Sequence, residues 1–139
     1  MKRRIYLAAS WRTPDHPRIL TLLRGAGHEV YDFREHGFHW DQIDPWWERW
    51  SPAEYKAAMT HPVAVEGFHR DFEAMIWANT CVLLLPSGPS AAIEAGWCKG
   101  SGRFLVVHVG GLRQADLMYK MADHLTLTDQ ELLSALELG

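Results

Sequence analysis

Residues 81–97 read CVLLLPSGPSAAIEAGW, an apolar run followed by a short polar loop and a second, mostly apolar segment. The run 81–85 is apolar at every position, which is typical of a strand buried on both faces of a parallel sheet. Proline, serine and glycine over 86–90 predict a tight loop, and 91–99 predicts a helix that ends at Gly100. A buried strand that leads into a helix is half of a βαβ unit, so this stretch indicates an α/β fold.

The same alternation continues on both sides of this unit. We expect further strands at 5–9, 28–31, 104–109 and 124–127, and further helices near 15–24, 52–59, 68–79, 115–121 and 129–138. Alternating strands and helices form a parallel sheet that is covered on both faces. The sequence therefore predicts a single flavodoxin-like or Rossmann-like α/β domain over 1–139, with about five parallel strands in the order 2-1-3-4-5.

The overall composition argues against several classes of partner. The chain is 47% hydrophobic and carries a formal net charge of −3, so we expect no nucleic-acid and no membrane partner. The apolar stretch after the basic N-terminus is too short for a signal peptide or a membrane span. Cys81 and Cys98 lie outside any CxxC or ligand pattern, as expected of reduced thiols in a cytoplasmic protein. The histidines are spaced irregularly, so we expect no metal and no cofactor.

Two loops at the predicted carboxyl edge of the sheet have the composition of ligand sites. The loop 86–90 leads directly into a helix, whose first N–H groups make an anion site. Alternatively, Ser90 only caps that helix and Gly88 only serves the turn. In the loop after the first strand, Ser10 and Arg12 are suited to bind a phosphate or hydroxyl groups. The alternative there is that Arg12 is an exposed loop cation.

Two carboxylates are candidates for catalysis. Glu94 lies one turn inside the helix after the loop, among small and apolar neighbours that leave room for a ligand. A carboxylate in this setting can act as a nucleophile at the anomeric carbon of a sugar, although a helix dipole alone also explains it. Asp71 lies at the edge of the apolar stripe formed by Phe68, Phe72 and Met75. From there it reaches a cleft, or it is a solvated carboxylate paired with a nearby cation.

Taken in order, these segments resemble the nucleoside 2-deoxyribosyltransferase-like superfamily, which includes nucleoside 5′-monophosphate N-glycosidases. The resemblance extends from the first strand to about residue 108, and its matching segments are Ile5-Tyr6-Leu7-Ala8, Asp71, Ala78-Asn79 and 86–97. It implies that Glu94 is the nucleophile and that Tyr6 orients its carboxylate. It also implies that Asp71 is the acid near the leaving base.

Three features depart from the family pattern or distinguish its branches. Ser87 stands where transferases often have an acidic residue, and Asn79 stands where an aspartate is usual. Residues 10–12 are similar to the Ser-x-Arg of the monophosphate hydrolases. Ser87 and Ser90 would also suit a phosphate, so the departures favour a nucleotide substrate or hydrolysis. The resemblance thus implies a substrate-binding set of Ser10, Arg12, Ser87, Gly88, Ser90 and Asn79.

A Trp-rich segment around 35–62 interrupts the alternation of strands and helices, and we interpret it as an insertion. It holds four of the seven tryptophans of the chain, Trp40, Trp46, Trp47 and Trp50. They form either a lid that stacks on a nucleobase or a structural plug or subunit interface. Among them we expect Trp40 to contact the ligand. The family habit of completing a site with a neighbour's residues, here near Met118 and Tyr119, implies a homodimer or a larger homo-oligomer.

The expected function is cleavage of the N-glycosidic bond of a nucleoside or a nucleoside 5′-monophosphate. Glu94 would form a covalent glycosyl intermediate, and another base or water would resolve it. An NAD-type glycohydrolase would use the same glutamate. A non-catalytic nucleotide-binding module would use the same loops without turnover. The sequence alone leaves these alternatives open.

Overall fold

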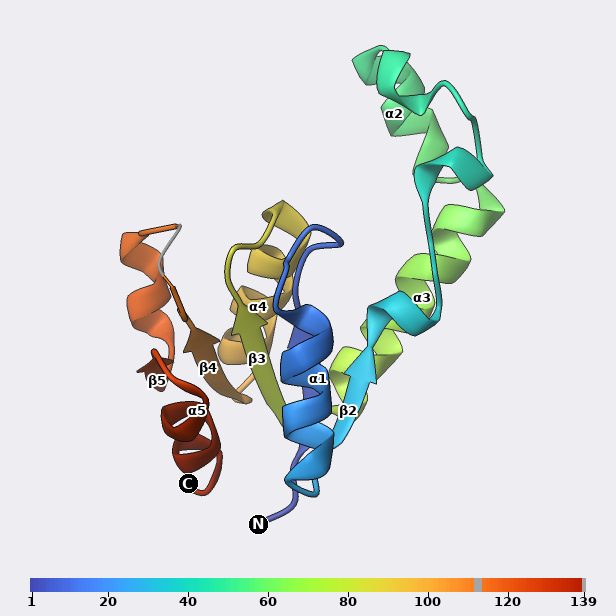
Figure 1. The fold of residues 1–139 in the computed structure, drawn as a ribbon. Coiled ribbons are helices and arrows are strands. Elements are labelled where there is room, and N and C mark those ends of the chain that lie inside the picture. Colours follow the sequence, from blue (N-terminus) through green and yellow to red (C-terminus); the bar gives the residue numbers. More distant parts are fainter. Residues whose placement is uncertain (112–113, 139) are drawn as a thin grey trace.

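A parallel sheet forms the centre of the computed structural model, which describes residues 1–111 and 114–138 (Figure 1). Its strands are β1 (Arg4–Ala8), β2 (Glu29–Asp32), β3 (Thr80–Leu84), β4 (Phe104–His108) and β5 (His124–Thr126). They lie in the order β2-β1-β3-β4-β5, and every neighbouring pair is parallel. The predicted fold class and strand order are confirmed. Residues 112–113 and residue 139, the end of the predicted domain, lie outside the described residues.

Most predicted helices are present, with some boundaries that differ. The α-helices are α1 (His16–Gly25), α2 (Pro52–Ala58), α3 (Pro62–Trp77), α4 (Pro89–Gly100) and α5 (Asp129–Leu136). The 3₁₀ helices are η1 (Phe33–Glu35), η2 (Trp40–Gln42), η3 (Trp47–Arg49) and η4 (Leu117–Met121). The helix predicted at 115–121 is therefore the short 3₁₀ turn η4. Gly88 occupies the N-cap of α4, so the interpretation of Ser90 as the cap is wrong. No helix among the described residues has both the length and the apolar character needed to cross a membrane.

Alternate residues of each strand pack on opposite faces of the sheet. Ile5 and Leu7 of β1 lie in the cluster that includes residues of α1 and α5. Tyr6 and Ala8 lie in the opposite cluster, which includes residues of α3 and α4. Parallel pairing sets Tyr6 beside Tyr31 of β2, so both tyrosines project toward the face covered by α3 and α4. This alternation brings β1 and β2 into contact with the helices that hold the two candidate carboxylates.

After β2 the chain leaves the sheet and forms an arm, residues 33–61, that stands away from the strands beside the first half of α3 (Figure 1). Trp40 is the centre of its packing, because its ring meets Phe38, Trp50 and Tyr55 edge-to-face at 5.0, 5.6 and 5.9 Å. The arm packs closely on α3 at Gly67, where a β-carbon would lie 3.2 Å from the ring of Phe38. The aromatic residues of the arm therefore pack against one another and against α3.

The predicted apolar stripe of α3 is only partly buried. Met75 is 5% exposed and lies in the core, whereas Phe68 and Ile76 are 62% and 47% exposed. Phe68 is exposed because the first half of α3 extends past the edge of the sheet toward the arm (Figure 1), whereas Ile76 lies on the outer side of the helix, next to the buried Met75. Phe68 stacks on Phe72 at 5.5 Å, and Phe72 contacts Trp97 of α4 at 5.0 Å. An exposed apolar surface thus runs along α3.

Candidate active site

A cavity of about 710 Å³ lies between the loop after β1, the arm, α3 and the start of α4. Seven of the predicted site residues line it: Glu94, Asp71, Ser10, Arg12, Gly88, Ser90 and Trp40. They come from four segments of the chain that are distant in sequence. The loops at the carboxyl ends of β1 and β3 contribute to it, which is where a sheet of this topology places its ligands. The sequence predictions therefore converge on one cavity.

Glu94 lies on α4 and is held by Tyr6 of β1. The Tyr6 hydroxyl donates a hydrogen bond to Oε2 of Glu94 at 2.5 Å, and the tyrosine itself is 1% exposed. Burial raises the pKa of Glu94 to about 7, the Tyr6 hydrogen bond opposes this rise, and the charge of Asp71 adds to it. Burial also raises the pKa of Tyr6, which therefore stays a hydrogen-bond donor. A carboxyl group poised in this way changes charge near neutral pH, as acid–base and nucleophilic chemistry requires.

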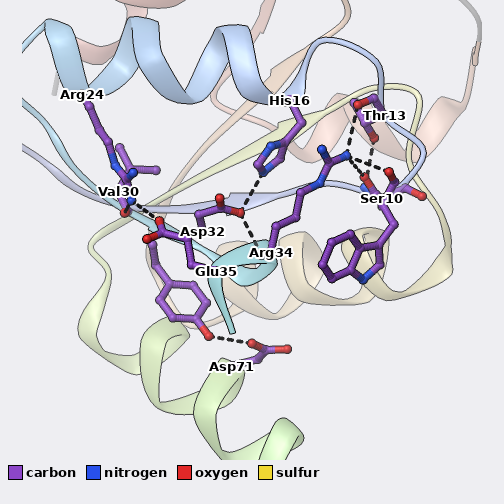
Figure 2. A network of polar contacts seen from close by, with 11 residues as sticks. Ser10, Thr13, His16, Arg24, Val30, Asp32, Arg34, Glu35 and Asp71 are labelled. Atoms are coloured by element: carbon purple, nitrogen blue, oxygen red, sulfur yellow. Dashed lines mark hydrogen bonds and ion pairs between the residues drawn. The ribbon is translucent and has the colours of Figure 1, made fainter. Parts of the chain in front are cut away.

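Asp71 lies on α3 and is held by Tyr31 of β2 (Figure 2). The Tyr31 hydroxyl donates to Oδ1 of Asp71 at 2.7 Å. Burial raises the pKa of Asp71, while the Tyr31 hydrogen bond, Arg70 and His36 lower it. Asp71 is thus partly buried and bound to a tyrosine, which differs from the alternative of a solvated carboxylate paired with a cation.

Tyr31 is a residue that the sequence interpretation missed. Its ring stacks on that of Tyr6, with centroids 5.4 Å apart and an interplanar angle of 17°. The ring of His36 stacks on Tyr31 in turn, at 5.0 Å and 14°. The available signal was register, because pairing of β1 with β2 sets Tyr31 opposite Tyr6. That register is a property of the sheet and is not visible in either strand alone.

The loop after β1 is fixed by a second residue that the sequence interpretation missed, Arg34. Its Nη2 donates to the backbone carbonyls of Ser10, Trp11 and Thr13 at 2.9, 2.9 and 3.2 Å (Figure 2). The backbone N–H of Arg34 donates to Asp32, whose Oδ1 also lies 3.0 Å from Nε2 of the buried His16. These carbonyls of the loop therefore point toward the guanidinium of Arg34.

Within this loop, the backbone N–H of Arg12 donates to the Ser10 hydroxyl at 3.1 Å. The Arg12 side chain is exposed and lines the cavity, which agrees both with the predicted phosphate contact and with the alternative of an exposed loop cation. Thr13 links this loop to the one before α4, because its hydroxyl donates to the carbonyl of Pro86 at 2.6 Å. The two loops predicted to bind the ligand are thus joined to each other.

Two predicted substrate-binding residues are not brought to the cavity. Asn79 precedes β3 at the amino edge of the sheet, and its Oδ1 accepts from the backbone N–H of Arg4 at 3.1 Å. The cavity lies at the carboxyl edge, so the structure separates Asn79 from the other site residues. Ser87 lies in the loop before α4, but Gln114 holds it through its backbone, with N–H and carbonyl contacts of 2.9 and 2.8 Å. Gly88 and Ser90 line the cavity in its place.

The outer part of the cavity has an aromatic wall that extends beyond the predicted Trp40. Trp11 of the β1 loop and His39 of the arm lie face toward face, with ring centroids 4.4 Å apart and a tilt of 35°. Phe33, Phe38 and Trp47 of the arm complete this wall. Among residues 1–111 and 114–138, no three His, Cys, Asp or Glu side chains are grouped as metal ligands.

Solved structures with the same fold include proteins that act on nucleosides and nucleotides. A 2-deoxyribosyltransferase from Bacillus psychrosaccharolyticus aligns with a TM-score of 0.69 and 18% identity, over 95% of this chain and 90% of that one. A CMP N-glycosidase from Clostridium botulinum aligns with a TM-score of 0.53 and 16% identity, over 99% of this chain and 100% of that one. A conserved protein from Enterococcus faecalis V583 aligns with a TM-score of 0.61 and 14% identity, over 99% and 97% of the two chains.

At identities of 14–18%, these likenesses show that the chain shares the fold of these three proteins. In the comparisons by sequence, no protein-family model and no curated protein matches the chain. The chemistry of the site therefore has to be argued from its own residues.

Proposed function

We propose that this protein is an enzyme that cleaves the N-glycosidic bond of a nucleoside or nucleoside 5′-monophosphate. The observation that carries this proposal is the pair of tyrosine-held carboxyl groups, Glu94 with Tyr6 and Asp71 with Tyr31, at one cavity. A glycosidic reaction of the retaining type needs one carboxylate for the sugar and one proton donor for the leaving group. The shared fold with a deoxyribosyltransferase and an N-glycosidase supports the same class of reaction.

In the first step, the Glu94 carboxylate attacks the anomeric carbon and forms a glycosyl ester. The carbon–nitrogen bond breaks, and its electron pair goes to the nitrogen of the base. Asp71 gives its proton to the departing base and becomes a carboxylate. Tyr6 holds the attacking carboxylate in place through its hydroxyl.

In the second step, water or another base attacks the same carbon and releases Glu94 as a carboxylate. Asp71 takes a proton from this attacking molecule and is again neutral. Water as the attacker gives hydrolysis, and a base gives transfer. Net charge and protons balance in both cases, so the chain's own residues suffice for the reaction.

A 5′-phosphate has suitable partners in this cavity. The guanidinium of Arg12 is exposed on the lining, and the start of α4 presents Gly88 and Ser90 beside it. Backbone N–H groups at a helix N-terminus and an arginine fork are both suited to phosphate oxygens. These features support a nucleoside 5′-monophosphate as the substrate.

A second candidate substrate is a dinucleotide of the NAD type, cleaved by the same carboxyl groups. The observation that favours it is the aromatic wall, because Trp11, His39 and Trp47 lie on a cavity of about 710 Å³. A cavity of this size is within the range that holds ligands of drug size. A second planar group could stack on that wall.

We also propose that the enzyme acts as a homo-oligomer. The exposed apolar surface of α3 supports this, since Phe68 is 62% exposed beside the stacked ring of Phe72. Large exposed apolar patches in soluble proteins mark interaction sites. Most soluble oligomers are homo-oligomers with closed symmetry, so a second copy of this chain is the partner we propose.

The experiment that tests the proposed function incubates the protein with nucleosides, their 5′-monophosphates and NAD, with and without an acceptor base. Released and exchanged bases are separated by chromatography, and intact-mass spectrometry of quenched samples seeks the glycosyl adduct. The decisive variant is Glu94→Ala. Its matched control is Glu73→Gln, which alters an exposed carboxylate of α3 outside this cavity.

We expect base release by the wild-type and Glu73→Gln proteins, and none by Glu94→Ala. The mass adduct should map to the peptide that contains Glu94. Binding of a nucleotide without turnover in the wild-type protein would contradict the proposal and would indicate a binding module.

A further inference from the structure

Tyr31 contacts Asp71 but does not itself line the cavity. Its hydroxyl lies 2.7 Å from Oδ1 of Asp71, and Asp71 lines the cavity. Tyr31 itself lines a neighbouring groove on the other side of β2 and α3. Figure 2 shows this hydrogen bond to Asp71 as a dashed line. The Tyr31 hydroxyl can therefore act on the reaction through Asp71.

We propose that Tyr31 is the positioning residue of the proton donor: its hydroxyl holds Oδ1 of Asp71 so that the carboxyl group delivers its proton to the leaving base. This inference rests on the proposed function and specifies the substrate further. The substrate class is a nucleoside or nucleotide whose base must gain a proton when it leaves. The Tyr31 proton stays on its own oxygen throughout. As Glu94 bonds to the anomeric carbon, the carbon–nitrogen bond breaks with its electron pair going to the base, and the O–H bond of Asp71 breaks as the N–H bond of the base forms.

The rings of both tyrosines are fixed by the fold, which makes this positioning specific. Tyr31 stacks on Tyr6 at 5.4 Å and on His36 at 5.0 Å, and the pairing of β1 with β2 sets the two tyrosines side by side. Each tyrosine reaches a carboxyl group on a different helix: Tyr6 reaches α4, and Tyr31 reaches α3. The stack therefore sets the positions of the nucleophile and the proton donor together.

The charged groups around Asp71 suit a proton donor that becomes a carboxylate when it has given up its proton. Its neighbours are Tyr31 of β2, Arg70 of α3, His36 after η1 and, across the cavity, Glu94 of α4. Burial raises the pKa of Asp71 and so favours the protonated form. The Tyr31 hydrogen bond lowers the same pKa, because it stabilises the carboxylate that remains after proton transfer.

The test compares substrates that need a proton on the leaving base with substrates that do not. Two probes, GMP and CMP, have bases that need a proton when they leave. Two others, N7-methyl-GMP and N3-methyl-CMP, carry cationic bases that leave as neutral molecules without a proton. The four corresponding nucleosides complete the set. The variants are Tyr31→Phe, Asp71→Asn and the double variant. Tyr55→Phe is the matched control, because it removes the hydroxyl of a half-exposed tyrosine of the arm outside the cavity.

We expect Tyr31→Phe to lower kcat/KM for the unmodified substrate about tenfold, which is the usual effect of one hydrogen bond to a charged group. For the methylated substrates, kcat/KM should change less than about twofold in the same variant. Adding Tyr31→Phe to Asp71→Asn should cost nothing further, since the tyrosine acts through the aspartate. Equal losses on both substrates, or additive losses in the double variant, would overturn the role of Tyr31 while leaving the proposed function intact.

A second measurement does not depend on turnover. The titration of Asp71, followed by NMR of carboxyl-labelled aspartate, should move to higher pH in Tyr31→Phe, because the bond that lowers its pKa is gone. An unchanged titration would overturn the positioning role. If the wild-type protein releases no base from any nucleoside or 5′-monophosphate of the full panel described above, the proposed function fails, and the catalytic role of Tyr31 fails with it.

Discussion

The phenol rings of Tyr6 and Tyr31 stack with their centroids 5.4 Å apart, and each hydroxyl donates to a different carboxyl group of the same cavity. The contact follows from the register of β1 with β2, which sets the two residues side by side on one face of the sheet. The core of the sheet thus determines where Glu94 and Asp71 lie. Because each tyrosine hydroxyl changes the pKa of its carboxyl group, replacing either tyrosine should change how activity depends on pH.

Replacement of Tyr6 by Phe should move the acidic limb of the kcat/KM profile to higher pH. The pKa of Glu94 is about 7, and the hydrogen bond from Tyr6 holds it lower than burial alone would. Since the reaction needs the carboxylate, loss of that bond should lower kcat/KM at pH 6 about tenfold, and the loss should shrink as the pH rises. A pH–rate profile of Tyr6→Phe beside Tyr55→Phe measures this. A loss that is equal at all pH values would contradict it.

Replacement of Glu94 by Gln should stabilise the protein at alkaline pH. Burial raises the pKa of Glu94 from an ordinary value of 4.5 to about 7, so ionisation of this group costs the folded state free energy. The cost is absent below the lower value, grows between the two and is complete above the higher one. At pH 9, Glu94→Gln should gain on the order of 1–3 kcal/mol in unfolding free energy.

Denaturant titrations between pH 4 and pH 9 measure this gain, with Glu73→Gln as the control. Glu73 is exposed on α3, so its replacement should change stability little at any pH. A gain for Glu94→Gln that is largest at pH 4 would show that the sign of the shift is wrong.

The sequence was sufficient to predict those parts of the fold and the site that local patterns determine. The continuously apolar runs at β3 and β4 indicated a parallel sheet, and the polar loop before α4 located Glu94. Asp71 and Tyr6 became candidates because they lie in short segments whose order resembles a known superfamily. All three residues are now found in hydrogen-bonded pairs at or beneath the cavity.

The parts that could not be predicted depend on contacts between distant segments. Tyr31 joins the site through strand register, and Arg34 joins it by reaching back to three carbonyls of the β1 loop. Asn79 was assigned to the substrate from the resemblance alone, whereas the structure places it at the amino edge of the sheet, where it bonds to the backbone of Arg4. Ser87 was expected to bind the substrate because a serine in such a loop suits a phosphate. In the structure, the side chain of Gln114, far along the chain, hydrogen-bonds to the backbone N–H and carbonyl of Ser87.

Replacement of Arg34 by Lys should loosen the β1 loop although the charge is kept. A lysine lacks the planar fork with which Arg34 reaches the carbonyls of Ser10, Trp11 and Thr13. We expect a loss of about 1–3 kcal/mol in unfolding free energy and faster amide exchange in this loop. Hydrogen exchange by mass spectrometry measures the second effect. Unchanged exchange in the loop peptide would mean that the Arg34 contacts do not hold the loop.

Replacement of Arg12 by Ala should lower activity on nucleotides much more than activity on nucleosides. If Arg12 binds the 5′-phosphate, kcat/KM for the monophosphate should fall about 10–100-fold, while the value for the nucleoside should stay within about twofold. Arg49→Ala is the matched control, because Arg49 is an exposed cation of the arm that lies over Trp46 outside the cavity. Equal losses on the two substrates would assign Arg12 to the loop structure and leave the phosphate without this partner.

Replacement of Phe68 by Asp should dissociate the proposed homo-oligomer. Phe68 is 62% exposed on α3, and its ring stacks on Phe72, so a charge there would be buried in any interface formed by this surface. An unpaired buried charge costs several kcal/mol, which is enough to convert a micromolar association into a monomer. Light scattering coupled to size exclusion measures the mass, with Leu125→Asp on β5 as the control, since Leu125 is 53% exposed on the far edge of the sheet. A wild-type monomer, or a variant that keeps the wild-type mass, would show that α3 is not the interface.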